Sequence, residues 1–144
     1  VVYTNQFMYS DVDATGFDYA FGQVPQMPAS YPVAAKWLQV IETVLAQATI
    51  PAHQGLIVTA DSFMSDQTSV AAIRQKFPEI IASDMESAAI AQIAHFYDIP
   101  VINLRGISDH VGEEAPDTFT DTLDLAATQA FKAVKALVDY YQNA

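Results

Sequence analysis

The sequence predicts an α/β domain built on a mixed, mostly parallel central sheet flanked by helices. Short apolar runs alternate with longer segments of helical periodicity, no internal repeat interrupts them, and 51% of the 144 residues are hydrophobic. Such alternation is typical of parallel sheets, because each crossover connection carries a helix over one face of the sheet. A chain of this length suits one domain, which we expect to span residues 1–144.

Four apolar runs are predicted strands. Residues 1–9 are rich in β-branched and aromatic side chains, and residues 55–59 form a continuous apolar run. Residues 80–82 and 100–104 are shorter strand candidates. Clusters of Gly and Pro in residues 10–32 predict a long loop between the first strand and the first helix.

Four segments have the spacing of amphipathic helices, at residues 33–47, 70–77, 85–97 and 119–141. The first is expected to bury Val33, Trp37, Val40, Ile41, Val44 and Leu45. The third is expected to bury Ala89, Ile90, Ile93, Ala94 and Tyr97. The last is expected to turn Leu123, Ala127, Ala130, Val134 and Leu137 toward the core.

The charge balance and the absence of cysteine narrow the function. With 6 basic and 17 acidic residues the net charge is −11, which disfavours nucleic acid and anionic membranes as partners. Without cysteine there is no disulfide, thiolate zinc site or cysteine nucleophile, and three scattered histidines predict no metal site. We expect a cytoplasmic protein, since no signal sequence or membrane-length apolar run is visible. Because the chain begins Val-Val-Tyr, we also expect it to be a fragment.

Polar residues gather after the predicted strands, where ligands bind in open α/β sheets. They are Asp61 and Ser62 with Phe63, then residues 83–86, then residues 105–110. Structural explanations remain open for several of them. Ser83 and Glu86 have the spacing of a helix capping box, and Asp109 precedes Gly112 as a turn residue does.

Four segments carry a family resemblance. Residues 17–25 (FDYAFGQVP), 55–63 (GLIVTADSF), 84–91 (DMESAAIA) and 105–109 (RGISD) resemble, in order and spacing, 5′-methylthioadenosine/S-adenosylhomocysteine nucleosidases, which have the nucleoside phosphorylase type I fold. The resemblance spans nearly the whole chain but only the later, carboxyl-terminal portion of the family pattern. It implies hydrolysis of an adenine nucleoside without a metal or organic cofactor.

The resemblance also implies roles for single residues. Asp109 matches the acid that protonates or hydrogen-bonds adenine N7, and Glu86 matches the acid that binds the ribose hydroxyls and helps to hold the attacking water. A proton at N7 makes adenine a neutral leaving group. The implied base and sugar contacts are Phe63, the Met64 backbone, Met85 and Ser108, with Arg105 and Asp84 in support.

The resemblance further implies a homodimer with a shared active site. Phe17, Tyr19 and Pro25 match the loop that reaches across the dimer to cover the alkylthio group, and Phe119 matches an apolar residue that closes the same pocket. The sequence departs from the pattern at two positions. Asp84 stands where the family usually has Glu, and Ala60 where Gly is common.

Two other functions remain open from the sequence. One is a purine nucleoside phosphorylase of the same fold, because Met85-Glu86 and residues 108–110 resemble that group too. The other is a non-catalytic α/β fragment or binding module, because the family's first strand and its acidic residue are absent from the sequence.

Overall fold

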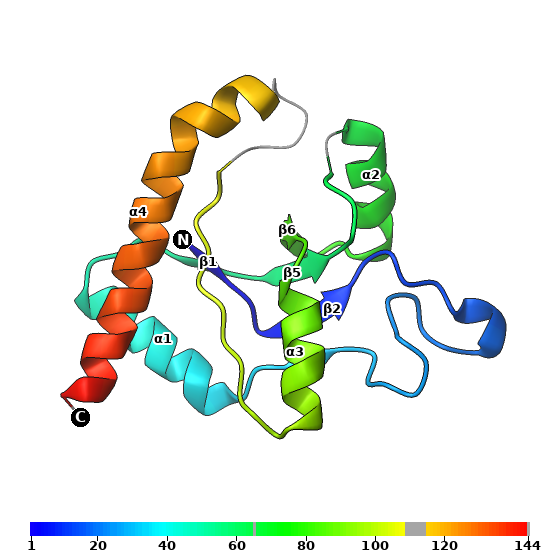
Figure 1. The fold of residues 1–144 in the computed structure, drawn as a ribbon, viewed down its shortest axis with the longest axis horizontal. Helices are drawn as coiled ribbons and strands as arrows, with labels where there is room; N and C mark the ends of the chain where they lie inside the picture. Colours follow the sequence, from blue (N-terminus) through cyan, green and yellow to red (C-terminus); the bar gives the residue numbers. More distant parts are fainter. Residues whose placement is uncertain (65, 109–114, 144) are drawn as a thin grey trace.

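The computed structural model describes residues 1–64, 66–108 and 115–143, with residues 115–121 described by their backbone only (Figure 1). The helices are α1 (Ala35–Gln47), α2 (Gln67–Lys76), α3 (Ser87–Phe96) and α4 (Ala115–Gln142), with a 3₁₀ turn at Thr15–Phe17. The strands are β1 (Val2–Tyr3), β2 (Gln6–Tyr9), β3 (Tyr31–Pro32), β4 (His53–Gln54), β5 (Leu56–Thr59) and β6 (Ile80–Asp84). None of these helices combines the length and apolar content needed to cross a membrane.

The main sheet has the strand order β3-β2-β5-β6 among the described residues. β2 and β5 are parallel, β5 and β6 are parallel, and β3 runs antiparallel to β2. β1 and β4 form a separate parallel pair. The expected mixed, mostly parallel sheet is therefore confirmed.

Both faces of the sheet are covered. Phe7 of β2 is buried in a cluster that includes Ala88 and Ala91, so α3 packs on one face. Leu56 and Val58 of β5 are buried with Phe77 and with the partly buried Ile73 of α2, which lies toward the other face. Because side chains alternate along a strand, a short buried strand such as β5 must be apolar on both sides, as this one is.

A second layer forms where α1 packs against α4. Ile41 and Leu45 of α1 are buried with Tyr3 of β1 and Ala133 of α4. In Figure 1 the segment that follows α3 runs between α3 and α4 toward the centre of the molecule. This segment carries Arg105, and the preceding residue, Leu104, packs against the cluster that contains Ala133 of α4.

The strand predicted at residues 100–104 is wrong. In the described chain none of these five residues pairs with a strand. The next residue, Arg105, forms an isolated antiparallel bridge to Val2. Val101, Ile102 and Leu104 instead pack their side chains against the two clusters beside α1 and α3. The apolar run therefore indicates that these side chains are buried, but not that their backbone belongs to a sheet. Pro100 also has no N–H group to donate to a neighbouring strand.

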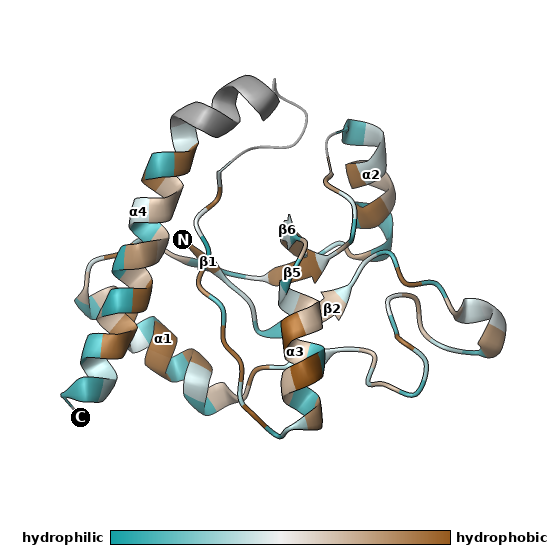
Figure 2. Ribbon diagram, in the orientation of Figure 1, coloured by the Kyte–Doolittle hydropathy of each residue, from teal (hydrophilic) through white to brown (hydrophobic). Residues whose placement is uncertain are grey.

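The buried faces predicted for two helices are also wrong in part. α3 buries Ala88, Ala91 and Ala94, whereas Ile90, Ile93 and Tyr97 are exposed. α4 buries Ala126 and Ala133, whereas Leu123 and Val134 are exposed. In both helices small side chains face the core, because alanine allows a helix axis to approach its neighbours closely. Figure 2 shows α3 as largely hydrophobic. In such a helix the polar and apolar faces differ little, so the spacing of apolar residues does not identify the buried face.

Tyr31 provides a prediction about alkaline pH. Burial, together with the nearby Tyr9, raises the pKa of Tyr31, and burial raises the pKa of Tyr3 and Tyr9 in the same direction. A group whose pKa is higher in the folded state gives stability that is fully present below its unfolded pKa and is lost as the pH rises further. We therefore expect the free energy of unfolding to fall above about pH 10, as measured by urea unfolding at about pH 8 and 10.5.

Replacing Tyr31 by Phe should make this alkaline fall shallower. Within the described residues the buried Tyr31 hydroxyl has no hydrogen-bond partner, so the substitution removes no bond. Tyr9→Phe is the comparison for a lost hydrogen bond, since the Tyr9 hydroxyl donates to Gln92 Oε1 at 2.9 Å and its loss should lower stability already at about pH 8. Because the pKa of Tyr9 is raised as well, this variant should also make the alkaline fall shallower. An unchanged alkaline fall in Tyr31→Phe would contradict the prediction.

Candidate active site

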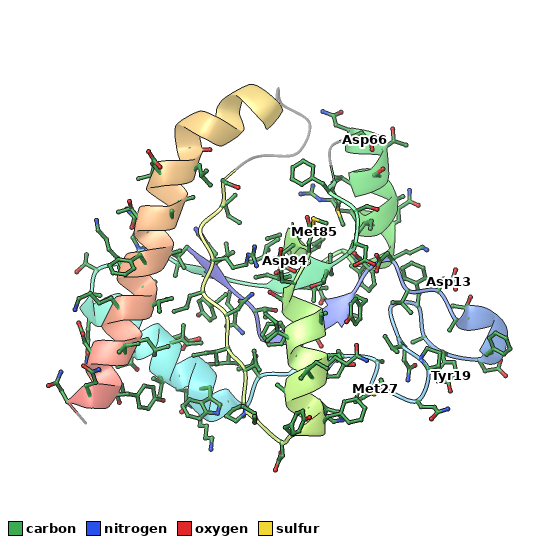
Figure 3. All side chains as sticks on the ribbon, viewed as in Figure 1. Asp13, Tyr19, Met27, Asp66, Asp84 and Met85 are labelled. Carbon is green, nitrogen blue, oxygen red and sulfur yellow. The ribbon has the colours of Figure 1, made fainter. Side chains whose placement is uncertain are left out.

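The candidate site lies at the edge where β5 and β6 end. These parallel neighbours pair Thr59 with Asp84, so the residues that follow them emerge on the same side of the sheet. Phe63 and Met64 follow β5, and Met85 follows β6. Phe63 is 58% exposed and Met85 is 45% exposed, so both side chains are free to contact a ligand. Figure 3 shows Asp84 and Met85 together near the centre of the molecule.

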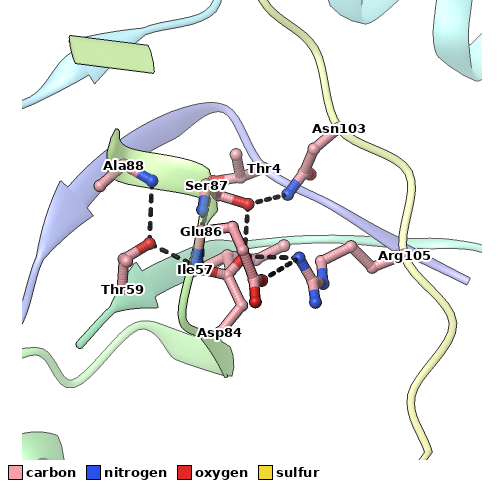
Figure 4. Close-up of polar contacts among 9 residues, drawn as sticks. All are labelled: Thr4, Ile57, Thr59, Asp84, Glu86, Ser87, Ala88, Asn103 and Arg105. Carbon is pink, nitrogen blue, oxygen red and sulfur yellow. Dashed lines mark hydrogen bonds and ion pairs between the residues drawn. The ribbon is translucent and has the colours of Figure 1, made fainter. Parts of the chain in front are cut away.

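Asp84 is a buried carboxylate that accepts five hydrogen bonds (Figure 4). Its Oδ1 accepts from the Thr59 hydroxyl at 2.7 Å, from the Ser87 N–H at 3.1 Å and from the Glu86 N–H at 3.3 Å. Its Oδ2 accepts from the Ser87 hydroxyl and from Arg105 Nη1, the latter at 3.0 Å. A buried charge is tolerated only when it is paired in this way.

Arg105 connects the buried carboxylate to an exposed one. The Nη1 atom that contacts Asp84 also lies 3.4 Å from Glu86 Oε2, and the Glu86 side chain is 60% exposed. The two carboxylates and one guanidinium carry a net charge of −1. Such a cluster can accept hydrogen bonds from hydroxyl groups and can stabilise positive charge that develops on a bound ligand.

The backbone around Arg105 fixes this geometry. Val2 N–H donates to the Arg105 carbonyl at 2.8 Å, and Arg105 N–H donates to the Val2 carbonyl at 2.9 Å. A Cβ on Gly106 would lie 2.2 Å from the Ala126 carbonyl oxygen, so only glycine lets the chain approach α4 this closely. The backbone that carries the guanidinium is thus held by Val2 at Arg105 and by close packing against Ala126 at Gly106.

The capping-box explanation for Glu86 is wrong. Glu86 occupies the N-cap position of α3, but its side chain makes no capping hydrogen bond. Asp84 accepts the N–H groups of Glu86 and Ser87 instead, which satisfies the start of the helix. The Glu86 carboxylate is therefore left for Arg105 and for a ligand.

The loop that carries Phe63 ends at a second capped helix. Asp66 accepts from the Ser69 N–H at 2.9 Å and from the Ser69 hydroxyl at 2.6 Å. These hydrogen bonds lower the pKa of Asp66, and the bond from the Ser69 hydroxyl has the larger effect. This cap starts α2 at Gln67, three residues before the predicted start.

Other predicted site residues lie elsewhere or outside the described part. Phe17 is 81% exposed, and Tyr19 and Pro25 belong to the same loop, where the Tyr19 hydroxyl accepts from Gln26 N–H at 3.3 Å. Figure 3 shows Tyr19 well apart from Asp84 and Met85. The Ser108 carbonyl accepts from the Thr122 hydroxyl. Asp109 and the side chain of Phe119 lie outside the described residues.

Three polar residues near Asp84 were not predicted from the sequence as part of the site. They are Thr59, Ser87 and Asn103, whose Nδ2 donates to the Ser87 hydroxyl at 3.1 Å. The available signal was a polar side chain next to or inside an apolar run, because a buried polar group must find a partner. As for metals, the described residues contain no group of three His, Asp or Glu side chains that could hold one.

Comparison with known proteins matches almost the whole chain. The family model described as the phosphorylase superfamily matches residues 1–139. The 5′-methylthioadenosine/S-adenosylhomocysteine nucleosidase of Anoxybacillus flavithermus is 39% identical over 140 residues, which cover 96% of this chain and 60% of that protein.

Two solved structures agree in fold. The nucleosidase of the same name from Neisseria meningitidis, in complex with methylthio-immucillin-A, is 37% identical with a TM-score of 0.90, covering 95% of this chain and 60% of that one. The one from Colwellia psychrerythraea 34H, in complex with adenine, is 35% identical with a TM-score of 0.89, covering 96% and 58%. These matches confirm the resemblance, and the chain spans about 60% of the length of the relatives it matches.

Proposed function

This chain belongs to the phosphorylase superfamily, and from that premise we propose that it carries much of the active site of a nucleosidase. The reaction is hydrolysis of the N-glycosidic bond of 5′-methylthioadenosine and S-adenosylhomocysteine, with release of adenine. The observation that carries the proposal is the cluster of Asp84, Glu86 and Arg105 at the carboxyl ends of β5 and β6. Relatives that share 35–39% of its residues and its fold bear the name of this activity.

Asp109 is proposed as the general acid. Cleavage of the bond between adenine and ribose develops positive charge on the sugar and negative charge on the base. A proton delivered to N7 lets adenine leave as a neutral molecule, which lowers the barrier. In the sequence, Asp109 comes four residues after Arg105, whose backbone pairs with Val2.

Glu86 is proposed to bind the ribose hydroxyls and to help hold the attacking water. Its carboxylate is exposed, and Arg105 contacts only one of its oxygens in the described structure. Met85, beside it, offers an apolar surface to the sugar. Phe63 is proposed to stack on the base while the Met64 backbone reads the adenine edge.

We propose that the site is completed in a homodimer. Figure 3 shows Tyr19 well apart from Asp84 in its own chain, so the loop that carries Phe17, Tyr19 and Pro25 is suited to cover the ligand of a second copy. Phe119 is proposed to close that pocket. The exposed apolar side chains of α3 and the residues after it offer an interface; they are Ile90, Ile93, Phe96, Tyr97 and Ile99. A monomer mass in sedimentation equilibrium would contradict this assembly.

An assay with and without phosphate tests the reaction. The purified protein is incubated with 5′-methylthioadenosine, and free adenine and the sugar product are followed by chromatography while mass spectrometry reports the chain length. We expect adenine release that does not depend on phosphate, because water is the proposed nucleophile.

The other outcomes decide between the alternatives. Release that requires phosphate, with a phosphorylated sugar as product, would assign a phosphorylase of the same fold. No release from a chain confirmed at 144 residues would mean that these residues form part of a site whose remaining groups are supplied elsewhere.

A further inference from the structure

Each oxygen of the buried Asp84 carboxylate accepts a hydrogen bond from one buried hydroxyl. The Thr59 hydroxyl donates to Oδ1 at 2.7 Å, and the Ser87 hydroxyl donates to Oδ2. Thr59 is only 2% exposed and Ser87 only 6% exposed. Neither hydroxyl lies on the surface that a ligand would touch, and neither has a role in the proposed chemistry.

Both hydroxyls have a fixed direction. The Thr59 oxygen accepts from the Ala88 N–H at 2.9 Å, and the Ser87 oxygen accepts from Asn103 Nδ2 at 3.1 Å. A hydroxyl whose oxygen already accepts from such a donor directs its single proton to another acceptor. In both cases the acceptor is Asp84, so the plane of this carboxylate is held from both ends (Figure 4).

The fixed carboxylate in turn fixes Glu86 twice. Asp84 Oδ1 accepts the Glu86 N–H at 3.3 Å and so holds its backbone. Asp84 Oδ2 holds Arg105 Nη1 at 3.0 Å, and the same nitrogen lies 3.4 Å from Glu86 Oε2. Any rotation of the Asp84 carboxylate therefore moves both the start of α3 and the guanidinium that restrains the Glu86 side chain.

We infer that Thr59 and Ser87 are positioning residues, which act through Asp84 to hold the Glu86 carboxylate where it meets the sugar of the nucleoside. This inference rests on the proposed function, because it takes Glu86 as the ribose-binding residue. The hydroxyls act on the sugar half of the site alone. Phe63 and Met64, the proposed base contacts, follow β5 after Thr59. The hydrogen bonds of the two hydroxyls lead instead to Asp84, Ala88 and Asn103.

The experiment compares a ligand that has the sugar with one that lacks it. Two variants of the full-length protein are made. Thr59→Val keeps the shape of the side chain and removes its hydroxyl, and Ser87→Ala removes the other hydroxyl. The catalytic constants kcat and KM for 5′-methylthioadenosine are measured together with the inhibition constant of adenine. We expect kcat/KM to fall by about tenfold in each variant, while the inhibition constant of adenine changes by less than about twofold.

Two further variants act as controls. Thr59→Ser restores a hydroxyl to the same position and is expected to recover most of kcat/KM. Thr43→Val makes the same chemical change on the exposed side of α1, where the hydroxyl donates to the Gln39 carbonyl at 2.7 Å, and should leave both constants as in the wild type.

The outcomes separate this inference from the proposed function. If the wild type releases no adenine, the proposed function fails and the inference fails with it. If the wild type is active and the variants match it, or lose affinity for adenine as much as for the nucleoside, the hydroxyls serve the fold alone and the inference is overturned. Should Thr59→Val fail to fold by circular dichroism, Ser87→Ala decides the matter, since it removes the hydroxyl on the other carboxylate oxygen.

Discussion

Replacing Asp109 by Asn is expected to slow the release of adenine by about 10²- to 10⁴-fold, the range that general acid catalysis usually contributes. An amide can hydrogen-bond to N7 but cannot give it a proton, so adenine would have to leave as an anion. The loss should fall on kcat more than on KM, because the proton is needed in the transition state. Adenine formation under single-turnover conditions measures the chemical step directly.

A substrate with a better leaving group makes this test specific. In a p-nitrophenyl riboside the leaving group is p-nitrophenolate, a stable anion that needs no protonation. Asp109→Asn should therefore slow cleavage of this substrate far less than cleavage of 5′-methylthioadenosine. Asp124→Asn is the matched control, since Asp124 is exposed on α4 and belongs neither to the proposed site nor to the proposed interface. Equal turnover of wild type and Asp109→Asn on the natural nucleoside would remove Asp109 from its assigned role.

The sequence predicts the fold here because strands and helices differ in length and period. In residues 33–47 the apolar side chains recur with the spacing of one helix face, and α1 forms within this range. The last helix spans the predicted residues 119–141, although it begins earlier, at Ala115. The prediction of a strand at residues 100–104 failed because an apolar run has the same composition whether its backbone pairs with a strand or its side chains only fill a core. That choice depends on which strand edges are available nearby, which a local pattern does not contain.

The same limit explains the errors in α3. Ile90 and Ile93 are more hydrophobic than Ala88 and Ala91, so any measure of hydrophobicity points to the isoleucine face. The structure buries the alanines because Phe7 and Tyr31 already fill the space beside the sheet and leave room only for small side chains. Size at a close approach, rather than hydrophobicity, decides which face of this helix turns inward.

The sheet edge that carries the candidate site could be predicted from the sequence, but the hydrogen bonds within the candidate site could not. Parallel strands put the residues after β5 and β6 at one edge, which follows from topology alone. That Asp84 caps α3 while Glu86 remains exposed could not be inferred, because the spacing of Ser83 and Glu86 fits a capping box equally well. The choice depends on Thr59 and Arg105, which lie 25 and 21 residues from Asp84 along the chain.

Asp84→Ala is expected to lower the free energy of unfolding by about 2–4 kcal/mol, since removal of one partner leaves the others buried and unpaired. Two backbone N–H groups, two hydroxyls and Arg105 would lose their acceptor together. Arg105 is 37% exposed and can recover some hydration, which keeps the loss below that of a fully buried pair. Urea unfolding near neutral pH measures the change.

Asp139→Ala provides the matched comparison, because Lys135 and Asp139 form an ion pair at 2.6 Å in which both side chains are about half exposed. Its loss should cost less than about 0.5 kcal/mol, as exposed pairs on one helix usually do. If the two variants lost similar stability, the hydrogen bonds of Asp84 would contribute no more to stability than an exposed ion pair, which would contradict the prediction. A large loss in Asp84→Ala alone would show that the stability of this edge depends on the buried carboxylate that is linked through Arg105 to Glu86, the proposed sugar-binding residue.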